Sequence, residues 1–580
     1  MKTQPEHTGE GTFTASDLLF QTLQDAGVEY IFANLGSDHP AIIETWAKYR
    51  ARGEKLPQVV VCPHEMVALS AAHGFTQATG RLQAVLVHVD VGTQNLGGAV
   101  HNAMRGRIPV FIFSGASPVT LDGELPGSRN EFIHYLQDVF DQRGIVREYV
   151  KWDHDLHAGD NIDLIVKRAL QIANSEPRGP VYVMSPREML ERPIASESET
   201  SRVLEPIRPS GLAPQHAGEI ASALAQAKFP LMITSYLGRN HEAVRELVAL
   251  SERLAIPVME AGPYYMNFPS DHPMHLGFED FVNVNPYLEK ADVVVVLDCD
   301  IPWMPQKSRR AANGRLYWID SDPLKESIPL WYYTEEIAFR ADACVALRQI
   351  QAELDSLAWD ADEIERRRKQ VTVDAANIRK QWESKEQPTA DGVITPEFLS
   401  RTIREVIDKD TIIVNETISN YSVVWKHLRR TEPGTLFGSG ASSLGWHGGA
   451  AIGVKLAHPD RTVVALTGDG SFVFSVPSAV QLVAEKYKTP FLTVIYNNGG
   501  WKSPKLSTLA VHPDGAAKRN SDFHVEFPTN SSLERIAEAA GDAFAVKVTD
   551  PKQLKPALMT ALDHVKDGRS AVVNVMIEKL

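Results

Sequence analysis

The chain has few cysteines and no long apolar run. Its three cysteines, Cys62, Cys299 and Cys344, lie far apart and show no metal-ligand spacing, so we expect neither a disulfide framework nor a cysteine metal site. No apolar stretch reaches the roughly 18 residues that a membrane span needs. The polar start of the chain lacks the apolar core of a signal peptide, and residues 578–580 do not form a peroxisomal address. We therefore expect a cytoplasmic protein that does not enter a membrane.

Positive charge is also scarce. The 59 lysines and arginines are outnumbered by 73 aspartates and glutamates, which gives a net charge of −14. Nucleic acids and anionic membranes both need a basic surface, so neither is expected as a partner. Hydrophobic residues make up 43% of the 580 residues and charged residues 23%, which indicates a globular protein of about three or four domains.

Strand-like and helix-like segments alternate in three stretches of the chain. The first stretch, 12–190, has apolar strands that end in polar loops, a pattern typical of a parallel α/β layer. Residues 193–214 are rich in Ser, Glu and Pro and indicate a linker. The second unit, 210–355, lacks a Gly-x-Gly-x-x-Gly fingerprint. A charged stretch, 351–390, predicts a solvated connecting helix, and the third unit is 390–580. The sequence predicts an α/β protein with three parallel-sheet layer domains.

The clearest functional signal comes from two successive strand ends in the third unit. A β-branched strand, 462–466, ends in a glycine turn at 468–471, and a second apolar strand, 491–496, ends in two asparagines. Glycines allow a ligand to approach the backbone, and the N–H groups at the start of the next helix suit a phosphate. Asp469 and Asn498 offer the hard oxygen donors that Mg²⁺ prefers, and neighbouring parallel strands would bring them together.

This pattern resembles a known cofactor motif. Gly-Asp-Gly, the twenty-six residues 471–496 and Asn-Asn are similar to the thiamin-diphosphate motif of the thiamin-dependent decarboxylase and acetolactate synthase superfamily. A helix-capping Asp and a polar loop would explain each end alone but not the pair. The resemblance covers nearly the whole chain. It implies a pyrimidine-binding domain, a central Rossmann-like domain and a diphosphate-binding domain, in a homodimer or homotetramer with active sites between chains.

The resemblance also implies which residues meet thiamin diphosphate and Mg²⁺. Glu65 matches the glutamate that activates the aminopyrimidine, although a glutamate favoured by the helix dipole is the common alternative. Leu444 matches the apolar residue beneath the bent cofactor, where periodicity alone indicates a core leucine. A backbone carbonyl near Ser442 would accept from the 4′-amino group. The implied cofactor residues are Glu65, Thr417, Ser442, Leu444, Gly468, Asp469, Gly470, Ser471, Asn498, Gly500 and Trp501, with Asp469, Asn498 and the carbonyl of Gly500 as the metal ligands.

Two loops of the first unit favour a decarboxylase. Residues 32–37 look like the Phe-Gly-Asn-Pro-Gly-Ser loop of benzoylformate decarboxylase, and residues 88–95 are similar to its His-Ser-Ala-Ala-Gly-Thr-Gly-Asn segment. The two matches imply that Ser37 and His88 hold the substrate carboxylate and relay protons, which suits a group that titrates near neutrality. An isolated histidine at a strand end is more often structural. The second histidine of that decarboxylase has no counterpart after the strand 293–298, so the relay is incomplete.

We therefore expect a lyase that cleaves a 2-oxo acid with thiamin diphosphate and Mg²⁺. An acetolactate synthase-like transferase and a non-catalytic paralogue that binds thiamin diphosphate are the alternatives. The loop 499–505 matches neither branch and is either a mobile lid, whose Trp501 and Lys502 meet the substrate, or a solvated surface loop. His447 either faces the cofactor or is bonded structurally. Residues 268–277 match the flavin-binding pattern only in part, so FAD is not expected.

Overall fold

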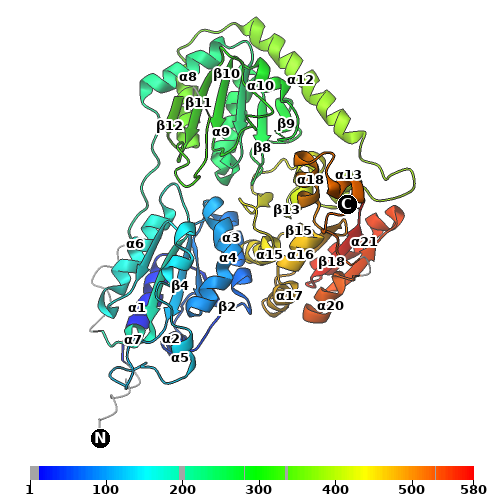
Figure 1. Ribbon diagram of the computed structural model, residues 1–580. Helices are drawn as coiled ribbons and strands as arrows, with labels where there is room; N and C mark the ends of the chain where they lie inside the picture. The colour runs from blue at the N-terminus through cyan, green and yellow to red at the C-terminus, as the bar shows by residue number, and fades with distance from the viewer. Residues whose placement is uncertain (1–11, 195–202, 280, 334–336, 529–530, 580) are drawn as a thin grey trace.

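Three six-stranded parallel sheets follow one another along the chain, each flanked by helices (Figure 1). The computed structural model describes residues 12–194, 203–279, 281–333, 337–528 and 531–579. The predicted α/β class with three parallel-sheet layers is confirmed. Within the described parts of the chain, every helix is too short or too polar to span a bilayer.

The first sheet has the strand order β2-β1-β3-β4-β6-β5. Its inner strands β3 and β4 are buried along their whole length, because helices cover a parallel sheet on both faces. The strands are β1 (Tyr30–Ala33), β2 (Gln58–Val61), β3 (Gln83–Val87), β4 (Val110–Ala116), β5 (Trp152–Asp155) and β6 (Val181–Pro186). The helices are α1 (Ala15–Asp25), α2 (Pro40–Arg52), α3 (Glu65–Thr79), α4 (Val89–Arg105), α5 (Ile133–Leu136), α6 (Ile162–Asn174) and α7 (Arg187–Leu190).

The central sheet has the strand order β12-β11-β10-β7-β8-β9. Its strands are β7 (Pro230–Thr234), β8 (Val258–Ala261), β9 (His275–Glu279), β10 (Val293–Leu297), β11 (Arg315–Asp320) and β12 (Ile337–Arg340). Its helices are α8 (Pro214–Gln226), α9 (His241–Leu254), α10 (Pro286–Lys290) and α11 (Ala343–Leu354). The long helix α12 (Ala361–Glu383) then runs from this layer toward the third one (Figure 1).

The third sheet has the strand order β14-β13-β15-β16-β18-β17. Its strands are β13 (Ile412–Glu416), β14 (Leu436–Gly438), β15 (Val463–Gly468), β16 (Leu492–Asn497), β17 (Phe544–Val548) and β18 (Ala571–Met576). Its helices are α13 (Pro396–Val406), α14 (Tyr421–Leu428), α15 (Trp446–Ala457), α16 (Asp469–Phe474), α17 (Pro477–Lys486), α18 (Lys502–Val511), α19 (Ala516–Asn520), α20 (Glu534–Gly541) and α21 (Pro551–Lys566).

Four strands that the apolar pattern does not predict all lie at sheet edges. They are β5, β9, β12 and β17. Strands β5, β12 and β17 are partly exposed, so their sequences need no continuous apolar run, whereas β9 is largely buried and its run is interrupted by His275, Gly277 and Glu279. Strand β12, for example, is exposed at three of its four residues. The pattern therefore finds the inner strands of each layer and misses these edges.

Helix α12 does more than connect two domains. Much of it is charged and exposed, as expected of a solvated connector, but Arg367 is buried. Its guanidinium donates to the carbonyl oxygens of Leu254, Ala255 and Ala227. These carbonyls lie at the C-terminal ends of α9 and α8, where an arginine satisfies groups that the helix leaves unpaired. The prediction of a purely solvated helix was wrong at this residue.

The first and third domains pack through α3 and α15 (Figure 1). Two glycines of α15 allow the backbones to approach. A Cβ atom on Gly453 would lie 1.9 Å from the carbonyl oxygen of Ala71, and one on Gly449 would lie 2.7 Å from that of Val67. No side chain fits in this space without moving a helix.

We expect Gly453→Ala to loosen this helix pair. The added methyl group would overlap the backbone of α3, and overpacking of this kind typically costs about 1–3 kcal/mol. Gly218→Ala in α8 is the matched control, because its Cβ would meet nothing closer than 3.5 Å, and alanine is favoured over glycine in a helix by about 1 kcal/mol. Urea unfolding should show the first variant less stable than the parent and the second at least as stable. Equal stability of both variants would contradict the close packing.

Candidate active site

The carboxyl ends of β15 and β16 lie side by side and bring two predicted ligands together. The strands pair in parallel, with Gly468 opposite Tyr496. Asp469 follows the first strand, and the backbone N–H of Gly499 donates to its Oδ2 at 2.9 Å. Both Asp469 and Asn498 are buried. The two residues therefore lie together at one edge of the third sheet.

The Asp469 carboxylate has the environment of a cation ligand. Burial raises the pKa of this carboxyl above its usual range, although the backbone N–H groups of Gly470 and Gly499 oppose the shift. In the described part of the chain, no lysine, arginine or histidine forms an ion pair with it. The described residues also contain no group of three His, Cys, Asp or Glu side chains that could hold a metal. One carboxylate, one amide and a backbone carbonyl fit Mg²⁺, which completes its shell with phosphate oxygens and water.

A cavity of about 470 Å³ opens beside this loop. It is lined by residues between Asp469 and Lys579, with none from the first domain among them. Trp501 packs edge-on against Phe527, with ring centres 5.2 Å apart, and is 41% exposed. A Cβ atom on Gly470 would lie 2.6 Å from the indole nitrogen of Trp501, so any larger residue there would displace the indole ring. Ser471 is buried at the start of α16.

The Glu416 carboxylate serves as the N-terminal cap of α15. It is buried at the end of β13 and accepts from the backbone N–H groups of Trp446 (3.1 Å) and His447 (3.0 Å). The Nδ1 atom of His447 lies 2.7 Å from the same carboxylate. A carboxylate at a helix N-terminus is favoured by the free N–H groups and the helix dipole. His447 is therefore bonded structurally, which resolves one of the open alternatives.

Other predicted cofactor residues flank this cap. Thr417 is buried and donates from its hydroxyl to Asn415 Oδ1 at 2.9 Å. Leu444 is half-buried and Ser442 is exposed. The last two residues lie in the loop between β14 and α15, where a ligand could reach them.

Glu65 opens α3 in the first domain. Its Oε2 accepts from Asn95 Nδ2 at 3.1 Å, and a Cβ atom on Gly92 would lie 3.2 Å from its Oε1. His64 caps the helix by accepting from the N–H of Met66. The carboxylate is buried within its own domain.

One chain does not bring Glu65 to Asp469. Gln77, in the last turn of the 15-residue helix α3, donates to the carbonyl of Gly438 at the end of β14. At 1.5 Å per residue, Gln77 lies about 18 Å along the helix from Glu65. Conversely, the N–H of Val61, just before Glu65, donates to the hydroxyl of Tyr487, at the end of α17 that leads into β16. The carboxyl edge of the first sheet, which contains Glu65, therefore lies beside the amino edge of the third sheet. The carboxyl edge of the third sheet, which contains Asp469, lies beside the amino edge of the first.

Ser37 and His88 lie at the same sheet edge as Glu65, because they follow β1 and β3, and β1 pairs in parallel with both β2 and β3. The Nδ1 atom of His88 lies 2.6 Å from Asp38 Oδ1, and its Nε2 lies 3.2 Å from Gln137 Oε1. Burial would lower the pKa of His88, but the hydrogen bond and charge of Asp38 raise it above its ordinary value. In turn, His39 and His88 lower the pKa of Asp38 against the effect of burial.

A second histidine joins this cluster from an unexpected part of the chain. His134, in the short helix α5, has its Nε2 3.5 Å from the hydroxyl of Ser37. It is buried, and burial with the nearby Arg187 lowers its pKa. The second histidine expected after β10 is absent from the sequence. No periodic pattern in the irregular segment 117–142 indicates that His134 returns to Ser37.

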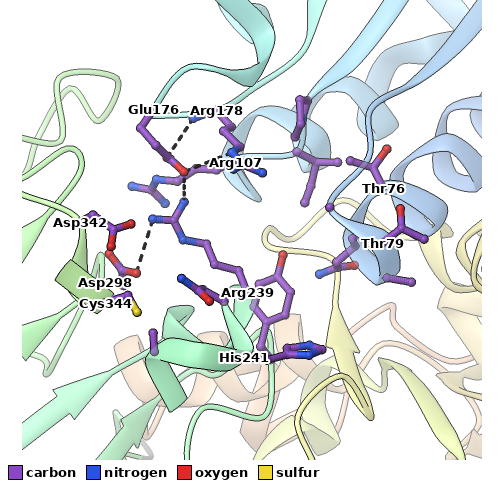
Figure 2. Close-up of a pocket in the computed structure, with 18 residues that line it drawn as sticks. Thr76, Thr79, Arg107, Glu176, Arg178, Arg239, His241, Asp298, Asp342 and Cys344 are labelled. Carbon is purple, nitrogen blue, oxygen red and sulfur yellow. Dashed lines mark hydrogen bonds and ion pairs between the residues drawn. The ribbon is translucent and has the colours of Figure 1, made fainter. Parts of the chain in front are cut away.

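A second cavity, of about 390 Å³, lies where the first and central domains meet. Figure 2 shows the Arg239 guanidinium between two carboxylates in this cavity. Arg239 lies 2.7 Å from Glu176 of the first domain and 3.4 Å from Asp298 at the end of β10. Burial raises the pKa of Asp298 to about 7, although Arg239 opposes the shift. The cavity is thus lined by a buried charge cluster that joins two domains.

Tyr236 packs at the place where α/β sheets bind nucleotides. The strand order of the central sheet reverses at β7, so the crevice falls between the ends of β7 and β10. The N–H groups of Ser235 and Tyr236 donate to the carbonyl of Asp298 there, at 3.1 and 3.0 Å. The buried Tyr236 ring lies 4.4 Å beneath the guanidinium of Arg107 from the first domain. Tyr236 fills part of this crevice, and Asp298 at its rim also lines the neighbouring cavity.

Three parallel α/β layers, with a carboxylate and an amide at neighbouring strand ends of the third, define a three-domain cofactor-dependent enzyme class. Three family profiles match the chain in the same order. They are the thiamine pyrophosphate enzyme N-terminal TPP binding domain at residues 13–145, the central domain at 217–350 and the C-terminal TPP binding domain at 417–575. The chain belongs to the thiamine pyrophosphate enzymes.

Its relatives include both branches considered above. It is 25% identical to the acetolactate synthase isozyme 3 large subunit of Escherichia coli, over 97% of this chain and 95% of that protein. It is 24% identical to the benzoylformate decarboxylase of Pseudomonas aeruginosa, over 84% and 86%. The solved benzoylformate decarboxylase of Polynucleobacter necessarius has a TM-score of 0.79 and 22% identity, covering 98% of this chain and 99% of the other. These identities show a thiamin-diphosphate enzyme and do not determine its reaction.

The variant Asp298→Asn tests the buried carboxyl at the domain junction. With a pKa of about 7 in the folded protein against an ordinary 3.8, this group keeps its proton where the unfolded chain has lost it. The contribution of this group to the free energy of unfolding is therefore largest below about pH 4, falls by at most about 1.4 kcal/mol per pH unit, and levels off above about pH 7. We expect the stability of the variant relative to the parent to rise across that window in urea unfolding.

The exposed Asp355 provides the control for this measurement. Asp355→Asn removes a carboxylate that is paired with Arg253 at the surface, so its stability relative to the parent should change little across the same pH window. A pH-independent difference between the Asp298 variant and the parent would contradict the raised pKa.

Proposed function

We propose that the protein is a thiamin-diphosphate- and Mg²⁺-dependent lyase that removes CO₂ from a 2-oxo acid and releases an aldehyde. The observation that carries the proposal is the edge of the first sheet, where Glu65, Ser37 and His88 follow three adjacent strands. A carboxylate, a hydroxyl and an imidazole at one edge supply groups that can hold a substrate carboxylate and move protons. His134 adds the second imidazole that the sequence search did not find.

The cofactor, when bound, accepts the electron pair left by the departing CO₂. Asp469, Asn498 and the carbonyl of Gly500 would hold Mg²⁺, whose charge offsets the buried carboxylate. Glu65 would hold the aminopyrimidine. The remaining cofactor contacts are proposed at Thr417, Ser442, Leu444, Gly468, Gly470, Ser471 and Trp501. We also propose that the enzyme works without flavin, because residues 268–277 match the flavin-binding pattern only in part.

We propose that two chains complete each active site. Within one chain the Glu65 edge and the Asp469 edge face opposite ends of the domain pair, so a second copy must supply the missing half. Both edges expose apolar side chains that a subunit contact would cover. Phe132 and Phe140 beside the first edge are 78% and 112% exposed, and Phe474 and Leu506 near the second are 49% and 50% exposed. A homodimer is the minimum assembly, and a pair of such dimers would form a homotetramer.

A panel of 2-oxo acids tests the reaction. With Mg²⁺ and thiamin diphosphate, we expect equal amounts of CO₂ and aldehyde from at least one acid, and Glu65→Gln should reduce the rate about 10²–10⁴-fold by removing a proton-transfer partner. The exposed Glu44→Gln is the control and should keep the parent rate. Chromatography separates the products. Acetolactate formed from pyruvate would favour the transferase instead, and unchanged activity of Glu65→Gln would refute the assignment of Glu65.

Mixing two inactive variants tests the shared site. Glu65→Gln damages the first-domain half and Asp469→Asn the third-domain half, so each homodimer should be inactive. Co-expression should restore about a quarter of the parent activity, because random pairing makes half the dimers mixed and each mixed dimer has one intact site. Failure of the mixed dimers to recover activity, with dimers confirmed by gel filtration, would place both halves of the site in one chain.

A further inference from the structure

His88 has a hydrogen-bond acceptor at each ring nitrogen. The Asp38 carboxylate lies 2.6 Å from Nδ1, and the amide oxygen of Gln137 lies 3.2 Å from Nε2. A neutral imidazole has one N–H and can satisfy only one of these acceptors, whereas an imidazolium donates to both. The geometry around the ring therefore favours the doubly protonated form.

The Asp38 carboxylate is committed to His88 by the groups around it. It is buried, and its Oδ2 accepts from the backbone N–H of Val89 at 3.1 Å. His39 is the other histidine near Asp38 Oδ1, at 3.0 Å, but its Nδ1 accepts from the N–H of Gly36. A nitrogen that accepts cannot also donate, so His39 does not supply a proton to Asp38. Burial likewise lowers the pKa of His39, which keeps that ring neutral.

The remaining charge near His88 acts in the same direction. Asp90, in the first turn of α4, faces the ring without a hydrogen bond to it and also favours its protonated form. Gln137 is neutral. Arg187 contacts the backbone of Ser37 rather than His88. Asp38 is thus the one carboxylate in the described cluster that both touches and charges the imidazole.

We infer that Asp38 is a positioning residue that keeps His88 as an imidazolium, so that His88 meets the substrate as an acid. Asp38 contacts neither substrate nor cofactor in this arrangement and acts through the ring. The acid role rests on the proposed lyase function, whereas the charged state of His88 does not. The inference assigns different protonation states to the two histidines beside Asp38: His88 is charged and His39 is neutral.

The proton balance of the acid step is simple. The proton leaves His88 Nε2 and forms the C–H bond on the carbon that has lost CO₂, which completes the aldehyde. His88 becomes neutral and still donates from Nδ1 to Asp38. A proton from water then restores Nε2–H, and the carboxylate of Asp38 keeps its charge throughout. The net reaction consumes one proton and releases CO₂, with no other reactant.

Titration of His88 in the holoenzyme tests the charged state without substrate. NMR of isotope-labelled histidines, with the His88 signal assigned by its loss in His88→Asn, should give a midpoint above the ordinary 6.5. In Asp38→Asn the midpoint should fall by about 1–3 pH units, the usual effect of removing an adjacent opposite charge. Asp90→Asn removes a nearby carboxylate that makes no hydrogen bond to the ring, so it should move the midpoint by less than half as much. An unchanged midpoint in Asp38→Asn would overturn the inference.

The pH profile of kcat/KM tests the acid role. Because an acid must be protonated to act, activity should fall as pH rises through the His88 midpoint, and this alkaline limb should move to lower pH in Asp38→Asn by the amount that NMR records. Asp38→Glu retains the carboxylate and should return both values toward those of the parent. An alkaline limb that stays in place while the NMR midpoint moves would overturn the acid role. Absence of decarboxylation with every 2-oxo acid would refute the lyase proposal and leave the titration result standing.

Discussion

Close packing of α3 against α15 determines where Glu65 and Asp469 lie relative to each other. Because Gly449 and Gly453 let the helix backbones touch, the first and third domains are held in a fixed relation, with Gln77 bonded to Gly438. That relation directs Glu65 and Asp469 to opposite edges of the domain pair. A site that needs both residues then requires two chains. The oligomerisation that we propose is therefore a consequence of a contact inside one subunit.

The sequence predicts the buried strands and the polar motifs that directly follow them, because both depend on residues close together in the chain. The strands β15 and β16 are apolar because both faces are covered, and each ends in the polar residues that the motif requires. Adjacency in a parallel sheet then brings Asp469 and Asn498 together without further information. The edge strands β5, β12 and β17 escape prediction because partial exposure removes the apolar run.

Contacts made by irregular segments could not be predicted in this way. His134 reaches Ser37 only because the long connection after β4 folds back over the sheet edge, and no local pattern specifies that return. Asp38 is similar, since its role depends on the approach of His88 from another strand. Glu416 directly precedes the predicted cofactor residue Thr417, yet its carboxylate is bound by the N-terminus of α15. The sequence shows which acidic, basic and hydrogen-bonding side chains are present. Contacts between distant segments determine which of these side chains lie in the site.

Buried ion pairs hold the central domain against the first domain, and no bound nucleotide is needed for this contact. Lys325 is fully buried between Asp320 and Asp300, at 2.6 and 2.9 Å, and Asp300 also receives two hydrogen bonds from Arg107 of the first domain. Separating the domains would leave Asp300 with one partner fewer, and removing one partner of a buried pair typically costs about 3–5 kcal/mol. Tyr236 fills the space beneath Arg107. These charges join the central domain to the segment between α4 and β4, at the amino edge of the first sheet, whereas Glu65, Ser37 and His88 lie at its carboxyl edge.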